Sequence, residues 1–329
     1  MVLITIKSSY SGWSTKSLRH STNRGISYPE DVTWLNNNMF IEPFINNEFL
    51  RLSLAAGILV AVTCAIAGTF VVLRGLAFVG DALAHGVLPG IATAMLLGVS
   101  GIFGAAVGAL VMMGGVSLVS RRFRLSGDTA IGLLFVGMLA LGVMITSRSR
   151  TFVGDLSRIL FGELLGVNST DLLLQLLALV IVAIIAFISR RPFLLLSVDE
   201  GLANTSGFST RVFHNAMLTM IAITVVASFQ TVGTLLVLGM LIAPAATGAL
   251  FARRISTMML IATLVGSAST YIGLLISYHF NLAAGASIVL TAVFIFAIVA
   301  TFTEIKKSLT DRQTDEHEHQ HIHSGAHVR

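Results

Sequence analysis

The sequence predicts an all-α fold, a polytopic transmembrane helical bundle of about eight or nine membrane segments. Hydrophobic residues make up 55% of the 329 positions and charged residues only 11%, against about 25% charged in a typical soluble domain. The mean hydropathy is +0.86. The apolar runs are about 20 residues long, as a membrane-crossing helix requires, and lack the alternation of a transmembrane barrel strand. These features exclude an ordinary soluble domain and a disordered chain.

Each expected span is an apolar run bounded by polar or charged residues. The first begins at about Leu50, where polar sequence gives way to continuous apolar sequence. The runs around 214–243 are short and contain glycine, so we expect broken or re-entrant helices there, and either eight or nine crossings. The expected spans are 50–73, 76–98, 101–120, 128–147, 171–189, 214–229, 231–243, 256–278 and 283–303.

The basic residues predict the orientation of the bundle. Two spans separate each basic cluster from the next, and the positive-inside rule places all four clusters and the C-terminus in the cytoplasm. The loop 148–170 runs against this assignment, because it falls outside and yet contains arginines. The net charge of +5 therefore reflects topology and does not predict nucleic-acid binding. The clusters are Arg121, Arg122 and Arg124; Arg190 and Arg191; Arg253 and Arg254; and Lys306 and Lys307.

The chain divides into three parts. Residues 1–48 form a polar extension that we expect to be disordered; they contain no apolar core of a signal peptide, and Met39 is an alternative translation start. Residues 49–304 form the transmembrane domain, in which 197–213 is expected to be a cytoplasmic surface helix and turn. Residues 305–329 form a cytoplasmic histidine-rich tail.

One carboxylate lies inside an apolar run. Asp81 is followed four residues later by His85, and on a helix these positions share a face. A carboxylate within the bilayer costs about 2.5–3.5 kcal/mol on insertion scales, so it is expected to have a function. Oxygen and imidazole nitrogen both bind first-row divalent metals. Two ligands do not complete a site, but a symmetric dimer would bring four of them together.

A structural role for this pair stays open from the residues alone. Asp81 and His85 would then hydrogen-bond each other or pair with Arg74 inside the bundle. The Pro89-Gly90 step just beyond is expected to break the helix, and such breaks occur both at transport sites and as plain kinks.

The stretch 232–255 predicts a docking element. An apolar run ends at Pro244, and a short helix of small residues is expected from there to the Arg253-Arg254 pair on the cytoplasmic face. Such a helix would contact a soluble partner, although Pro244 would equally suit the plain start of the next helix. The residues of this element are Pro244, Ala245, Ala246, Thr247, Arg253 and Arg254.

The tail contains five histidines within eleven residues: His317, His319, His321, His323 and His327. Such tracts bind zinc, nickel or copper loosely, so the tail is either a metal-buffering or sensing segment or an inert solvated one. We discount the formal H-E-x-x-H match at 317–321, because that pattern needs a buried helix. His20, His214 and His279 are isolated and expected to be structural or interfacial. The chain has no phosphate-binding G-x-x-x-x-G-K-[ST] loop.

Three motifs, in this order, carry a family resemblance: GTFVVLRGLAFVGDALAHGVLPG at 68–90, DLSRILFGELLGVNSTDL at 155–172 and VGTLLVLGMLIAPAATGALFARR at 232–254. From about residue 43 to 304 the chain resembles the permease subunits of bacterial ATP-binding-cassette importers for zinc, manganese or iron(II). Gly86, Gly248 and Ala286 depart modestly from the commoner residues of that family.

The resemblance implies a permease in the bacterial plasma membrane that pairs with itself or with a paralogous permease. It implies a cytoplasmic ATP-binding subunit that hydrolyses ATP, an extracellular metal-binding protein that delivers the ion, and no permanently bound cofactor. Asp81 and His85 would then form the metal site in the translocation path. The helix from Pro244 to Arg254 would dock on the ATPase.

Two competing functions remain at this point. A secondary cation transporter would use Asp81 as its titrating group and would need no ATPase. A permease for metal chelates or cobalamin-type ligands would need a wide path and not an Asp/His pair. The choice among the three metals also stays open.

Overall fold

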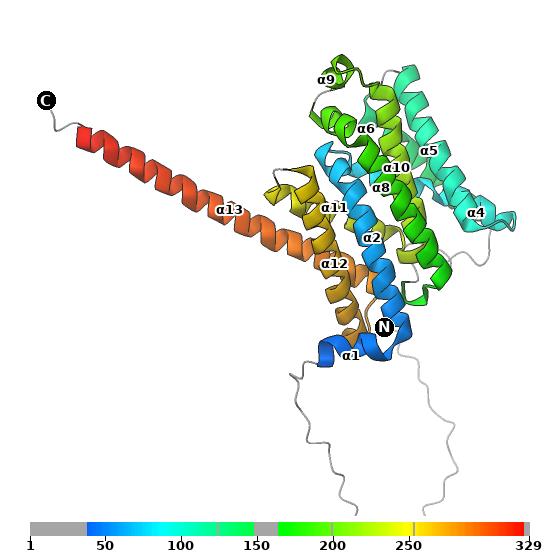
Figure 1. The fold of residues 1–329 in the computed structure, drawn as a ribbon. Coiled ribbons are helices and arrows are strands. Elements are labelled where there is room, and N and C mark those ends of the chain that lie inside the picture. The colour runs from blue at the N-terminus through cyan, green and yellow to red at the C-terminus, as the bar shows by residue number, and fades with distance from the viewer. Residues whose placement is uncertain (1–37, 124, 148–163, 199, 253, 326–329) are drawn as a thin grey trace, which may run out of the picture. The chain divides into compact units, whose positions relative to one another are not determined.

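The computed structural model describes residues 38–123, 125–147, 164–198, 200–252 and 254–325, and in this part of the chain it consists of helices and contains no strand (Figure 1). Eight helical segments of the described residues are long and apolar enough to cross a membrane. The elements in chain order are α1 (Asn38–Asn46), α2 (Glu48–Leu73), α3 (Ala77–Gly86), α4 (Leu88–Leu96), α5 (Gly101–Phe123), α6 (Gly127–Thr146), η1 (Leu164–Gly166), α8 (Ser169–Val198), α9 (Glu200–Thr205), α10 (Thr210–Val232), α11 (Thr234–Phe251), α12 (Ile255–Phe280) and α13 (Ala284–Gly325).

The predicted helical bundle is confirmed, and the second predicted span is the discontinuous one. It is built from α3 and α4, which meet at Val87, two residues before Pro89. The proline has no N–H to donate, so it is tolerated in the first turn of α4. The two short runs around 214–243 are instead continuous helices, α10 and α11. They join at Gly233, whose φ of 79° favours glycine.

Four boundaries differ from prediction. The apolar run does not end at Pro244, because α11 continues through it to Phe251. Likewise α8 continues past Arg190 and Pro192 to Val198. Part of the extension expected to be disordered is helical, since α1 begins at Asn38 and α2 at Glu48. The last helix does not end with the predicted span 283–303, because α13 runs unbroken to Gly325.

The helix α2 forms the centre of the packing. It contacts α8, α11 and α12, and 67% of its most apolar window is buried, against 17% for the span in α6 and 22% for that in α13. One buried polar link joins three spans: the Gln175 side-chain amide of α8 donates to the hydroxyls of Thr63 on α2, at 3.3 Å, and Ser228 on α10, at 3.2 Å. Such links hold membrane helices together where no water can satisfy polar groups.

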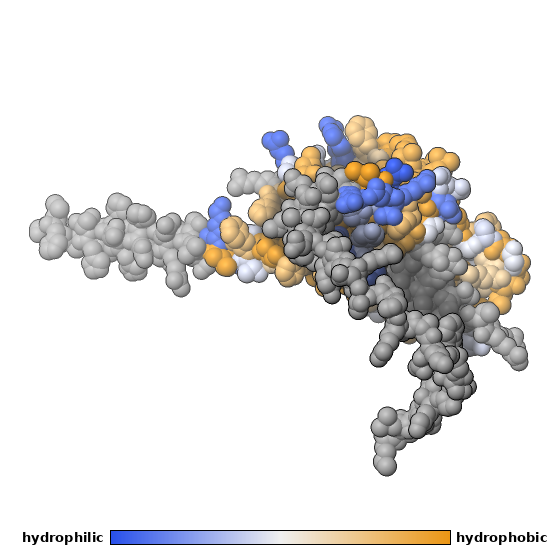
Figure 2. All heavy atoms as spheres, turned by 90° about the horizontal axis from the view of Figure 1, so that it is seen from below, coloured by the Kyte–Doolittle hydropathy of each residue, from blue (hydrophilic) through white to orange (hydrophobic). Residues whose placement is uncertain are grey.

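The outer surface is largely apolar. Many large hydrophobic side chains of the described residues are exposed, and in Figure 2 they appear beside patches of hydrophilic residues where grey atoms do not cover the face. Soluble monomers rarely expose contiguous apolar patches larger than a few hundred Å², whereas a membrane protein presents such a surface to lipid. The chain is therefore a multi-pass membrane protein.

Candidate metal site

Asp81 and His85 lie on one face of α3, as their spacing predicts. The carboxylate Oδ1 of Asp81 is 3.5 Å from Nε2 of His85, and the two side chains are 28% and 27% exposed. A charge-assisted hydrogen bond built for stability is about 2.7–2.9 Å long. Two ligands about 2.1 Å from one ion at a tetrahedral angle lie about 3.4 Å apart. The separation is therefore loose for a structural pair and suits two ligands of one ion.

The imidazole of His85 is held by an aromatic contact. Phe135 of α6 packs edge-on against the His85 ring, with centroids 5.6 Å apart, and also against Phe78, at 5.8 Å. The other ring nitrogen of His85, Nδ1, is buried and has no hydrogen-bond partner among the described residues. A buried polar atom without a hydrogen-bond partner costs free energy. The Nδ1 side of the His85 ring is therefore not arranged as a purely structural Asp–His pair would be.

The pair lies closer to one membrane face than the sequence suggested. Asp81 is the fifth residue of α3, about 6 Å along the helix axis from Ala77, and His85 is about 12 Å along. The hydrocarbon core is about 30 Å thick. Asp81 is therefore one helical turn inside the span, and only His85 approaches the middle.

In the described part of one chain, no third ligand joins the pair. Among the described residues no group of three His, Cys, Asp or Glu side chains could hold a metal ion. Arg74, the alternative partner of Asp81, forms a hydrogen bond of 3.1 Å from Nη1 to Nδ1 of His214. In the tail, His317, His319, His321 and His323 belong to α13, which ends at Gly325; His327 lies outside the described residues.

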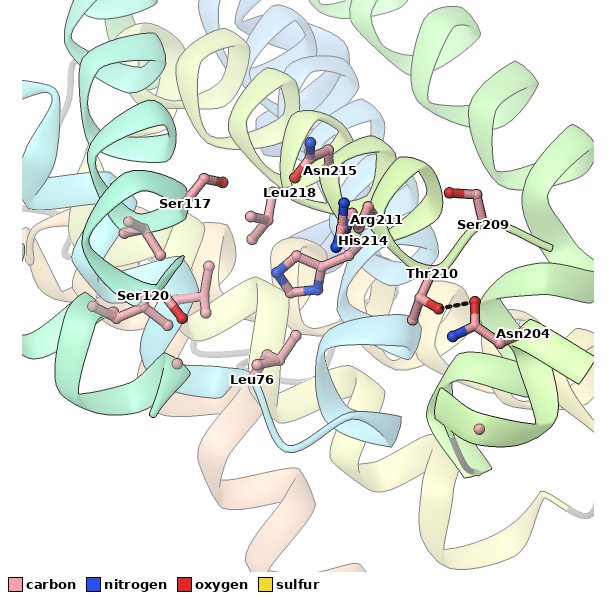
Figure 3. A pocket seen from close by; sticks show the side chains of 15 residues that line it. Leu76, Ser117, Ser120, Asn204, Ser209, Thr210, Arg211, His214, Asn215 and Leu218 are labelled. Atoms are coloured by element: carbon pink, nitrogen blue, oxygen red, sulfur yellow. Dashed lines mark hydrogen bonds between the residues drawn. The ribbon is translucent and has the colours of Figure 1, made fainter. Parts of the chain in front are cut away.

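A cavity with a mixed polar and apolar lining lies beside α3 and does not contain the pair. It encloses about 780 Å³ between α3, α5, α6, α9 and α10, and its lining includes Arg211 and His214. Figure 3 shows these two side chains beside Thr210, whose hydroxyl donates to the Asn204 side-chain oxygen at 2.7 Å. The helix α3 borders the cavity through Val79, which points about 160° away from Asp81 around the helix. The pair and the cavity therefore lie on different sides of α3.

Sequence reasoning did not find the partner of His214, which it treated as an isolated histidine. The contact with Arg74 joins residues 140 positions apart, so no local spacing indicates it. The sequence suggests Arg74 only as a partner for Asp81.

The expected docking element is mostly inside the bundle. Pro244, Ala245 and Thr247 are buried, so these side chains cannot form the contact surface predicted for them. The cause is that α11 packs against α2, α12 and α13 along its length. Ala246 is partly exposed and Arg254 is exposed. Arg253 lies outside the described residues.

The described residues form eight apolar spans, and one of them is a discontinuous helix that carries Asp81 and His85; these features define a membrane permease. Comparison with known sequences gives the particular family. The chain belongs to the ABC 3 transport family, whose pattern matches residues 46–303. It is the membrane-spanning permease subunit of an ATP-binding-cassette importer for metal ions.

Relatives cover most of the chain. The manganese transport system membrane protein MntC of Listeria innocua is 36% identical over 264 residues, which span 80% of this chain and 94% of that protein. The chelated iron transport system membrane protein YfeD of Yersinia pestis is 34% identical over 269 residues, or 82% and 90%. The solved structure of PsaBC from Streptococcus pneumoniae in complex with Fab matches with a TM-score of 0.71 and 34% identity, over 79% of this chain and 94% of that one.

Proposed function

We propose that this permease carries manganese(II) or iron(II) through a site made by Asp81 and His85. The observation that carries the proposal is the 3.5 Å separation of the two ligand atoms on one face of α3, beside a buried imidazole nitrogen without a partner. Carboxylate oxygen and imidazole nitrogen suit both ions, and zinc as well. Relatives named for manganese and for iron support the first two ions.

The site is complete only in a pair of permeases. The described residues of one chain supply two ligands, and a two-fold axis beside α3 would bring two carboxylates and two imidazoles to one ion. The second permease is either another copy of this chain or a paralogue. About a quarter of each side chain is exposed in the single chain, which is consistent with a site that a second subunit closes.

Transport follows from alternating access. An extracellular binding protein delivers the ion, and a separate cytoplasmic subunit hydrolyses ATP, because this chain has no phosphate-binding loop of its own. Closure of the ATPase subunits rocks the two permeases against each other, and the ion leaves on the cytoplasmic side. The break between α3 and α4 at Val87 is where the site-bearing half-helix can tilt by itself.

The competing functions lose support. A secondary transporter would need no ATPase, and membership of the ABC 3 transport family speaks against it. The proposed cargo is the free ion, since an Asp/His pair ligates a bare ion directly. Cellular metal content under metal-limited growth tests this: loss of the chain should lower manganese or iron, and an unchanged content of both would contradict the proposal.

The ATPase subunit is proposed to dock on the exposed end of α11. Leu250 and Phe251 are exposed at that end, and Arg254 follows. The positive-inside rule assigns this side, the C-terminal tail and the four basic clusters to the cytoplasm of a bacterial plasma membrane.

Changing Phe251 to Asp tests the docking surface. The side chain is 55% exposed, so the new charge is tolerated in water but removes an apolar contact with the partner. We expect at least a tenfold fall in the amount of ATPase subunit that co-purifies. The control is Phe280→Asp, a phenylalanine 71% exposed at the opposite end of α12. If equal amounts of the ATPase subunit co-purify with the two variants, the proposed docking surface is contradicted.

The histidine tail is proposed to concentrate metal near the exit of the path. The five tail histidines lie within eleven residues, and such tracts bind metal ions weakly. Changing all five tail histidines to Asn should leave uptake at saturating metal unchanged and alter cellular metal tolerance a few-fold. Growth across a metal titration measures this effect. Identical tolerance curves would identify the tail as inert.

A further inference from the structure

A second open cavity lies where the ends of three spans meet. It encloses about 720 Å³ between the end of α2, the second half of α8 and the start of α12. Apolar side chains form most of its wall, among them Ile66, Leu194 and Met259. Three arginines complete the wall: Arg190, Arg191 and Arg254. None of the described residues that line it is acidic.

Within the described residues, the three arginines have no counter-charge. All three are exposed, and none of them forms an ion pair or a hydrogen bond within the part of the chain that the structure describes. The guanidinium carbon of Arg190 lies 5.8 Å from the ring centroid of Phe187, a cation–π contact. Three like charges on one wall repel one another, so an anion in the cavity would be stabilised.

The depth of these arginines matches the lipid headgroups. Arg190 is 21 residues beyond Ser169, the first residue of α8, which is about 32 Å along the helix. The hydrocarbon core of a bilayer is about 30 Å thick. The apolar wall of the cavity thus faces the hydrocarbon edge, and the arginines stand at the level of phosphates.

We propose that this cavity binds an anionic phospholipid, with its phosphate on the arginines and an acyl chain along the apolar wall. Guanidinium groups bind phosphate oxygens in bidentate fashion, and basic pockets between membrane helices on the cytoplasmic side suit lipids of this kind. Because the wall carries three arginines, we expect a lipid with two phosphates, such as cardiolipin, to be favoured over a lipid with a single phosphate. A soluble phosphate would use the arginines and leave the apolar wall unfilled.

The test compares lipid retention in charge-matched variants of the full chain, purified with its partner subunits. The test variant is Arg190→Gln with Arg191→Gln, and the control is Arg122→Gln with Lys307→Gln, which removes two exposed cations that line no cavity described here. Arg254 is kept because it also borders the proposed docking surface. Bound lipids are measured by mass spectrometry, and thermal stability is measured with added phosphatidylglycerol, cardiolipin, phosphatidylethanolamine or inorganic phosphate.

We expect wild type and control to retain anionic lipid and to gain stability with cardiolipin and phosphatidylglycerol but not with phosphatidylethanolamine. The test variant should retain at least tenfold less. Equal retention by both variants would overturn the proposal, and so would equal stabilisation of wild type by inorganic phosphate or by phosphatidylethanolamine. Loss of the ATPase subunit with unchanged lipid would assign the arginines to a protein contact. The comparison of added lipids and inorganic phosphate on the wild-type protein tests the proposal even if the test variant fails to fold.

Discussion

Replacement of Asp81 by Asn, or of His85 by Ala, is expected to lower the initial rate of manganese uptake at least about 100-fold, the upper range for loss of even an outer-shell group at a metal site. In a pair of identical chains each change removes a ligand atom from both halves of the site, so two of four ligands are lost at once; in a pair with a paralogue one of the four is lost. Both side chains are partly exposed, so neither change leaves a large cavity or buries a new charge. Uptake of radioactive manganese by cells that produce equal amounts of membrane-inserted protein measures the effect.

Matched controls use the same residue types away from the pair. Asp171→Asn lies at the start of α8, where the carboxylate accepts from the Asn168 backbone N–H. His279→Ala lies near the end of α12, where the ring contacts the Leu275 carbonyl. Uptake within about twofold of wild type is expected for both. Normal uptake by the Asp81 and His85 variants would contradict the site.

The crossing of α4 and α5 is expected to be as sensitive to substitution as the Asp81–His85 site itself. Gly90 and Gly104 face each other there, and a Cβ on either would overlap the backbone carbonyl oxygen of the other. Backbone cannot move aside as a side chain can, so Gly90→Ala forces the two helices apart. Overpacking of this kind costs typically 1–3 kcal/mol, occasionally more. We expect a lower melting temperature in detergent, and reduced uptake, because α4 continues the half-helix that carries the pair.

The control is Gly137→Ala in α6, where an added Cβ would meet no atom within 4 Å. Alanine is favoured over glycine in a helix interior by about 1 kcal/mol, so this variant should be unchanged or more stable. Both substitutions replace glycine by alanine. Gly90→Ala is predicted to lower the stability, whereas Gly137→Ala is predicted to leave it unchanged or raise it. A Gly90→Ala protein as stable as Gly137→Ala would show that α4 and α5 do not cross this closely.

The spans could be predicted from the sequence because membrane insertion depends on local composition. A run of about 20 apolar residues fits the bilayer whatever its neighbours are, and the run in α2 needs no other information. The Asp81 and His85 pairing was equally local, since a spacing of four fixes a shared helix face. The family resemblance was strong for the same reason: its motifs are short and contiguous.

The predictions that failed concern features that depend on contacts between segments far apart in the sequence. A proline usually ends a helix, but α11 continues through Pro244 because the surrounding helices cover it and, as is usual in membrane bundles, the freed backbone is re-satisfied locally. Burial of the small residues after it followed from that packing, so the docking element could not be placed from composition. The contact of His214 with Arg74 likewise exists only once α2 and α10 are packed.

The measurement that tests the central claim most directly is the stoichiometry of manganese bound to the purified importer at equilibrium. The account predicts one tightly bound ion for every two permease chains, with a mixture of oxygen and nitrogen ligands in its X-ray absorption spectrum. It predicts that this ion is lost when Asp81 is Asn or His85 is Ala. One ion per chain, or binding that both variants leave unchanged, would contradict the claim that two Asp81–His85 pairs form one site.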